Sequence, residues 1–159
     1  MAASHVLVID DEQHIRAFVR DALETFGYAV DVAADGVQGL ALFDQHHYDL
    51  LLLDLRMPHL GGWEILQAIT WRRPTRAVIM SGFVTPMDEE QARQLGVVIL
   101  RKPFTVADFK QVVQEALAGP PGDVSKKPLA KSGEEDGEAE LRRIAQSESP
   151  PVTPLPTRH

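Results

Sequence analysis

The sequence of 159 residues contains no cysteine, which excludes disulfide bonds and thiolate metal sites. It also lacks a long apolar stretch, because the run Leu50–Leu53 is far shorter than the ~20 residues that a membrane-spanning helix requires. Residues 1–6 do not combine a basic segment with an apolar one, so they predict no signal peptide. Together these absences indicate a cytoplasmic protein that does not bind a membrane.

Basic residues are fewer than acidic residues. The chain has 16 Lys and Arg residues against 23 Asp and Glu residues, and its formal net charge is −7. A surface of that sign repels a phosphate backbone, so we expect no direct contact with nucleic acid. Hydrophobic residues make up 44% of the chain, which is enough for a packed core over most of its length.

Aromatic residues are missing altogether from residues 119–159, which contain seven of the 11 prolines, seven acidic residues and six basic residues. Such a segment cannot bury enough apolar surface to offset the cost of ordering its backbone. Within it, Glu138–Gln146 has helical spacing, but an isolated helix of that length is marginal in water. We therefore predict one domain over residues 1–118 and a disordered, proline-rich and charged tail over residues 119–159.

The first 118 residues alternate between two hydrophobic patterns. Short apolar runs, typical of buried strands, alternate with segments whose apolar residues recur at helical spacing. The predicted strands are 5–9, 28–32, 50–53, 77–80 and 97–100, and the predicted helices are 12–26, 36–45, 62–70, 87–95 and 105–117. Thr105 and Asp108 indicate a cap at the start of the last helix. This order predicts an α/β fold: a flavodoxin-like, doubly wound, five-stranded parallel sheet in the order 2-1-3-4-5 with five helices.

Polar residues follow four of the predicted strands. Asp10 and Asp11 come after the first, Asp54 after the third, Ser81 after the fourth, and Lys102 closely follows the fifth. Because the carboxyl ends of parallel strands meet at one edge of a sheet, we expect these five side chains to share a cleft. Three converging carboxylates raise one another's pKa unless a cation is present. Oxygen ligands favour a hard ion, so the pattern predicts a Mg²⁺ site, with Mn²⁺ as the alternative ion.

The same residues also have simpler interpretations. An Asp pair after a strand is often the N-cap of the next helix, and a Lys before a proline is often a solvated turn residue. Each residue is a weak signal by itself, whereas the five together predict a reaction site. Beside Mg²⁺, Asp54 can attack phosphorus as a nucleophile, while Lys102 and Ser81 stabilise the charge on the transferred group.

Four motifs resemble those of response-regulator receiver domains, the family of the chemotaxis regulator CheY. They are VLVIDDE at residues 6–12, LLLDLRMP at 51–58, MSG at 80–82 and KPF at 102–104. The resemblance covers residues 4–118. It implies that Asp54 accepts a phosphoryl group from a histidine kinase or a histidine phosphotransfer protein.

The resemblance also implies a role for each of the other residues. Asp11, Asp54 and the backbone carbonyl of Arg56 would ligate Mg²⁺ directly, and Asp10 would do so through water. Ser81 would donate a hydrogen bond to the phosphoryl group. Lys102 would pair with that group, and the peptide bond between Lys102 and Pro103 would be cis.

One position departs from the family pattern. Ile99 stands three residues before the lysine, where receiver domains usually have Tyr or Phe as a rotating switch residue. An aliphatic side chain cannot move a ring or hydroxyl between core and surface, so the aromatic step of the usual switch is not expected here. The movement of Ser81, the other step of the switch, does not depend on this position. Arg56 and Phe83 occupy positions that often tune the lifetime of the phosphoryl group.

These features predict a phosphorylation-switched binding module rather than an enzyme with a separate substrate. Its output would be a contact with a protein target, which the sequence does not identify, mainly through the fourth helix, fifth strand and fifth helix; that surface would also serve a homodimer. Two alternatives stay open: a relay intermediate and the receiver fragment of a longer regulator. A degenerate scaffold is a third, but the full set of acidic residues, hydroxyl and lysine argues against it. A Mg²⁺-dependent aspartyl-phosphate phosphatase is a fourth alternative. Such enzymes have an Asp-x-Asp motif after the first strand, and the motif includes the nucleophile. Here Asp10 and Asp11 are adjacent, and the isolated Asp54 follows the third strand, which favours the receiver domain.

Overall fold

The computed structural model describes residues 3–119. Five strands alternate with five helices in the order β1 (His5–Ile9), α1 (Gln13–Thr25), β2 (Ala29–Ala33), α2 (Gly36–Gln45), β3 (Leu50–Asp54), α3 (Gly62–Arg72), β4 (Ala77–Ser81), α4 (Pro86–Leu95), β5 (Val98–Arg101) and α5 (Val106–Ala118). The predicted disordered tail lies outside the described residues, apart from Gly119. None of the helices between residues 3 and 119 has the length and apolar character needed to cross a bilayer.

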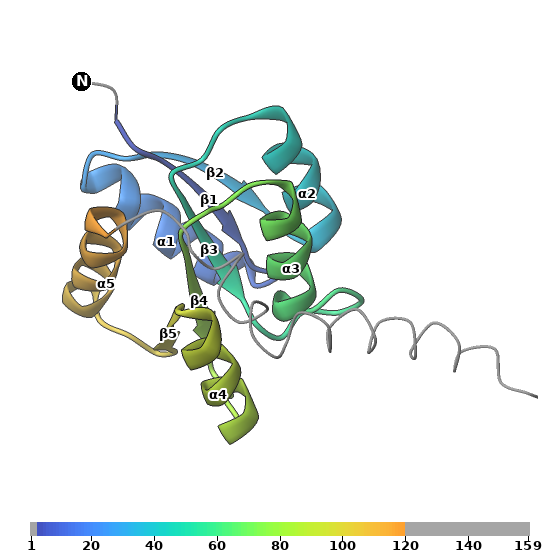
Figure 1. Ribbon diagram of the computed structural model, residues 1–159. Helices are drawn as coiled ribbons and strands as arrows, with labels where there is room; N and C mark the ends of the chain where they lie inside the picture. The colour runs from blue at the N-terminus through green and yellow to red at the C-terminus, as the bar shows by residue number, and fades with distance from the viewer. Residues whose placement is uncertain (1–2, 120–159) are drawn as a thin grey trace, which may run out of the picture. The chain divides into compact units, whose positions relative to one another are not determined.

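All five strands form one parallel sheet in the order β2-β1-β3-β4-β5, as the sequence predicts (Figure 1). The chain winds outward from β1 in both directions, so the crossover between β1 and β3 is the point at which the strand order reverses. Ligands of such sheets bind beyond the carboxyl ends of the strands near that point. The topology therefore predicts a ligand site formed by the loops after β1, β3, β4 and β5.

Two hydrophobic layers cover the sheet, one on each face. One layer contains alternate strand residues such as Val6, Val8 and Leu52 and packs against α1 and α5. The other contains the intervening residues, such as Leu7 and Leu53, and packs against α2, α3 and α4. Figure 1 shows α1 and α5 on one side of the sheet and α2 and α3 on the other. Burial on both faces explains why β3 and β4 have no exposed residue.

Two strands begin one residue later than the sequence pattern predicts, and hydrogen bonds explain both differences. Helices α1 and α4 are followed by Gly27 and Gly96, which have φ values of +98° and +75° that favour glycine. The next N–H groups, of Tyr28 and Val97, donate back to helical carbonyls at 3.0 Å. Those two residues close the preceding helices, so β2 and β5 start after them.

Helix α5 is capped as the sequence predicts. The hydroxyl of Thr105 accepts a hydrogen bond from the backbone N–H of Asp108 at 3.0 Å. Phe104 stacks on Phe109 with ring centroids 5.5 Å apart, which ties the loop after β5 to the core. This loop carries Lys102 and Pro103, whose peptide bond is cis. The start of α5 thus fixes the segment that presents Lys102.

Candidate functional site

The carboxyl edge of the sheet brings together all five of the residues predicted to share a cleft. Asp54 and Ser81 are the last residues of β3 and β4, Asp10 directly follows β1, and Lys102 directly follows β5. An open pocket of about 590 Å³ lies at this edge, and Asp11, Asp54, Ser81 and Lys102 are among its lining residues. Asp10 is fully buried beneath it.

Three carboxylates form the acidic centre of the pocket. Asp10, Asp11 and Asp54 each offer an oxygen atom within 4.8 Å of the oxygen atoms offered by the other two. Burial raises the pKa of Asp54 to about 7, and the neighbouring charge of Asp10 adds to the effect. Burial also raises the pKa of Asp10. Three carboxylates that converge in this way fit a hard divalent cation, which would remove the repulsion between them.

Lys102 supplies positive charge beside these carboxylates. Its Nζ atom lies 2.9 Å from Asp10 Oδ2, 2.9 Å from Glu12 Oε1 and 3.5 Å from Asp54 Oδ1. Burial acts to lower the pKa of Lys102, but the hydrogen bonds to Asp10 and Glu12 outweigh burial and raise it. The ammonium group is therefore charged and is held at the pocket by two carboxylates of the loop after β1.

The simpler interpretation of the Asp pair as a helix cap is wrong. The N-cap of α1 is Glu12, whose side chain makes no capping hydrogen bond. Asp10 Oδ1 instead accepts the backbone N–H of Glu12 at 2.8 Å, and Arg16 donates to the Asp10 carbonyl oxygen at 2.8 Å. The bond from the Glu12 N–H holds one oxygen of the Asp10 carboxylate, and the other oxygen accepts from Lys102. The contact of Glu12 with Lys102 was not foreseen, although Glu12 belongs to the same acidic run as the Asp pair.

Ser81 is fully buried, and its hydroxyl group is engaged with the loop that follows β4. The hydroxyl donates to the carbonyl oxygen of Phe83 at 3.0 Å, and the hydroxyl oxygen accepts the backbone N–H of Phe83 at 3.2 Å. Ser81 thus holds the turn that carries the exposed ring of Phe83 over the pocket. A hydroxyl in this position can exchange its carbonyl partner for a ligand oxygen with a rotation about χ1.

Ile99 lies in the middle of β5, at the position predicted to replace an aromatic switch residue. Its side chain is half-buried and packs against the layer that includes Ala92 of α4 and Ile79 of β4. The consequence of this substitution for switching stays a prediction.

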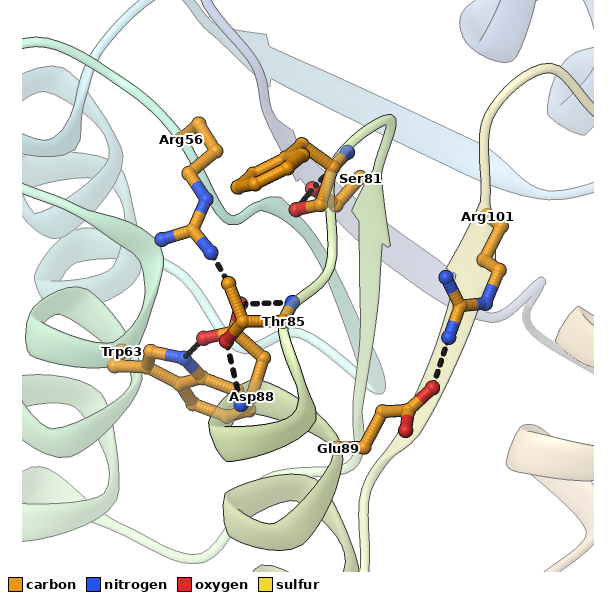
Figure 2. A network of polar contacts seen from close by, with 8 residues as sticks. Arg56, Trp63, Ser81, Thr85, Asp88, Glu89 and Arg101 are labelled. Atoms are coloured by element: carbon orange, nitrogen blue, oxygen red, sulfur yellow. Dashed lines mark hydrogen bonds and ion pairs between the residues drawn. The ribbon is translucent and has the colours of Figure 1, made fainter.

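A second polar cluster, which the sequence did not reveal, adjoins the pocket. Arg56 lines the pocket, and its guanidinium forms an ion pair with Asp88 in the first turn of α4 and lies 5.6 Å from the centre of the Phe83 ring. Figure 2 shows Arg56, Trp63 and Thr85 around Asp88. Thr85 and Asp88 have the spacing of a capping box, which a sequence pattern can detect. The partnership with Arg56, 32 residues away, leaves no such pattern.

The basic cluster Arg72, Arg73 and Arg76 has structural partners and is not a free cationic patch. Arg73 donates to the carbonyl oxygen of Phe43 at 2.6 Å and lies 3.8 Å from the centre of its ring. Arg72 pairs with Asp44 at 2.7 Å. Arg76 donates to the carbonyl oxygen of Gly119.

Comparison with known families gives a match over most of the described residues. The model of the response regulator receiver domain family matches residues 6–114. The response regulator ArlR of Staphylococcus saprophyticus is 30% identical over 117 residues, which are 73% of this chain and 53% of ArlR. The chain spans about half the length of the curated relatives that it matches.

Solved structures agree with this match. The chemotaxis protein CheY4 of Vibrio cholerae aligns with a TM-score of 0.69 and 28% identity, over 73% of this chain and 100% of CheY4. The response regulator TrrA of Thermotoga maritima, solved in complex with Mg²⁺ and BeF, aligns with a TM-score of 0.65 and 26% identity, over 72% of this chain and 99% of TrrA.

Proposed function

Because the chain belongs to the response regulator receiver domain family, we propose that it is a phosphoacceptor in which Asp54 receives the phosphoryl group. The single observation that carries this assignment is the position of Lys102 Nζ, 2.9 Å from Asp10 and 3.5 Å from Asp54, at a pocket with three adjoining carboxylates. A nucleophile, a cation and a set of hard metal ligands thereby adjoin one open pocket.

Asp10, Asp11, Asp54 and the backbone carbonyl of Arg56 are the residues that would hold Mg²⁺. The fit rests on three converging oxygen ligands, and the Mg²⁺ bound by TrrA, which is similar to this chain, supports it. Mn²⁺ has the same ligand preference and is the alternative ion. When bound, the ion supplies positive charge to the carboxylates and to the oxygen atoms of the incoming phosphoryl group.

The residues of the chain have distinct parts in the transfer. A carboxylate oxygen of Asp54 attacks phosphorus, the new O–P bond forms, and the bond from phosphorus to the donor breaks with its electron pair leaving on the donor. The ammonium group of Lys102 neutralises the transferred charge from the Asp10 side. Ser81 turns its hydroxyl from the Phe83 carbonyl to a phosphoryl oxygen, which frees the turn after β4.

We propose a histidine kinase or a histidine phosphotransfer protein as the donor and a protein as the target. The surface formed by α4, β5 and α5 suits such a contact, because it exposes Met87 by 79%, Val98 by 50% and Val106 by 47%. The same surface would serve a homodimer. This function places the protein in the cytoplasm, with no catalysis beyond its own phosphorylation and dephosphorylation.

The test is incubation with acetyl phosphate and Mg²⁺, followed by measurement of intact mass. Wild-type protein should gain the mass of one phosphoryl group, and the gain should disappear with EDTA or in Asp54→Asn. Asp44→Asn, which removes an exposed carboxylate of α2, is the matched control and should react normally. Absence of an adduct would contradict the proposal, and turnover of many phosphomonoesters would favour a phosphatase instead.

A further inference from the structure

Asp88 is a buried carboxylate that the phosphoacceptor chemistry does not use. It is 6% exposed and has partners on three different segments. Trp63 of α3 donates its indole N–H to Oδ1 at 2.9 Å, and the backbone N–H of Thr85, the residue before α4, donates to Oδ2 at 2.9 Å. The third partner is the guanidinium of Arg56, from the loop after β3 (Figure 2). These contacts lower the pKa of Asp88 against the opposing effect of burial.

Two of the three partners are fixed in place. Trp63 follows Gly62, which packs so closely on the end of β3 that a Cβ atom there would lie 2.6 Å from the carbonyl oxygen of Asp54. Thr85 and Asp88 are joined by a capping box, in which the Thr85 hydroxyl also accepts the Asp88 N–H at 3.1 Å. Neither partner can move far without disturbing a helix terminus.

Arg56 is the partner that can move. Its side chain is 45% exposed and is attached to a loop rather than to a helix or strand. It also lines the same pocket as Asp54 and Phe83. A guanidinium at this place can reach either the carboxylate of Asp88 or an anion that occupies the pocket.

Phosphorylation would change the balance between these two anions. A phosphoryl group carries about −2 charge and three strong acceptor oxygens, which a guanidinium binds in bidentate fashion. Lys102 is already engaged on the other side by Asp10 and Glu12. If Arg56 turns to the phosphoryl group, Asp88 stays buried without its cation, and an unpaired buried charge is costly.

We propose that Asp88 is a positioning residue that holds Arg56 aside in the unphosphorylated protein, and that transfer of Arg56 from Asp88 to the phosphoryl group carries the signal to α4. The inference rests on the proposed function of Asp54. It supplies a link between the pocket and α4 that does not need an aromatic residue at Ile99. When the guanidinium of Arg56 leaves Asp88, it also leaves the ring of Phe83. The turn after β4 and the start of α4 therefore lose a contact with Arg56 at the same time.

The chain contains a natural reporter of this exchange. It has two tryptophans: the indole N–H of Trp63 is bonded to Asp88, whereas Trp71 is 72% exposed at the far end of α3. The experiment records the indole N–H resonances of ¹⁵N-labelled protein before and after addition of Mg²⁺ and beryllofluoride, an analogue of the phosphoryl group. The bound analogue is followed by its ¹⁹F signal, and Trp71→Phe assigns the two indole peaks. We expect the Trp63 peak to shift and the Trp71 peak to stay in place.

Variants separate this exchange from a general effect of ligand binding. Asp88→Asn retains the shape and the acceptor for Trp63 but removes the charge that holds Arg56, so the Trp63 shift should fall severalfold. Arg56→Gln should also lose the shift, and Arg56→Lys, which keeps the charge, should restore part of it. Glu89→Gln is the matched control, because Glu89 is the next residue of α4 but pairs with Arg101 on the exposed side of the helix. It should respond like the wild type.

Each result is decisive. A bound analogue with an unmoved Trp63 peak in the wild type would overturn the inference, as would a full Trp63 shift in both Asp88→Asn and Arg56→Gln. Arg56 is exposed, so its variants keep the test valid if Asp88→Asn does not fold. Failure of the wild type to bind beryllofluoride would instead overturn the proposed function, on which the inference rests.

Discussion

Replacing Asp54 with Asn should stabilise the metal-free protein at alkaline pH. Asp54 is 4% exposed, and its carboxyl group lies beside the buried carboxyl group of Asp10. Burial and that neighbour raise its pKa from 3.8 to about 7. The protein therefore holds, at its reaction site, a carboxylate whose ionised form opposes folding until a cation binds. The amide of Asn has nearly the same shape and no charge.

The sign and size of the effect follow from proton linkage. Between pH 3.8 and about 7, the folded state retains the proton of Asp54 while the unfolded chain has released it. Stability therefore falls as the pH rises through this window, and the loss is complete above the folded pKa. The whole window corresponds to ~4 kcal/mol, and the interval from pH 5 to pH 8 corresponds to roughly 2–3 kcal/mol.

The assay is urea unfolding in EDTA at pH 5 and at pH 8. The advantage of Asp54→Asn over the wild type should grow by roughly 2–3 kcal/mol between the two pH values. Asp21→Asn, which removes an exposed carboxylate of α1, should show no such growth. Saturating Mg²⁺ should stabilise the wild type at pH 8 much more than Asp54→Asn. Equal pH dependence in wild type and Asp54→Asn would refute the reasoning.

Three further substitutions test how the site is supported. Gly62→Ala should lower the free energy of unfolding by about 1–3 kcal/mol, because its Cβ would lie 2.6 Å from the carbonyl oxygen of Asp54; Gly82→Ala, with its nearest neighbour at 3.9 Å, is the control in urea unfolding. Lys102→Met should destabilise the metal-free protein at pH 8 by about 3 kcal/mol, since two buried carboxylates lose their cation. A loss of the same size with saturating Mg²⁺ would argue against that cause. Thr105→Ala should cost about 1 kcal/mol in thermal unfolding through loss of the α5 cap, and Thr105→Ser should not.

Much of the fold could be predicted because local signals and topology agree. Short buried strands alternate with amphipathic helices, and that order admits few arrangements of a parallel sheet. The reaction site follows from the same reasoning, since Asp54 and Ser81 come directly after apolar runs that must be buried, and Lys102 follows such a run after one residue. The errors at the starts of β2 and β5 are small and have one cause. Tyr28 and Val97 are apolar enough for strands, but their N–H groups complete the preceding helices.

The contacts around Asp88 could not be predicted, because they join residues that are distant in sequence and individually ordinary. The sequence placed Arg56 beside the reaction site, but nothing in it indicated that Arg56 and Trp63 share a partner on α4. A capping pattern explains Thr85 and Asp88 without any reference to the pocket. The tertiary approach of α4 to the loop after β3 gives these side chains a shared role.

The central claim is that Asp54 is the phosphoacceptor, and site mapping tests it most directly. Protein treated with acetyl phosphate and Mg²⁺ is reduced with borohydride, which converts an aspartyl phosphate to homoserine, and the peptides are then sequenced by mass spectrometry. The account predicts homoserine at position 54, dependent on Mg²⁺, with Asp10 and Asp11 unmodified. Homoserine at Asp10 or Asp11 instead of Asp54 in the wild-type protein, or no homoserine at all, would contradict it.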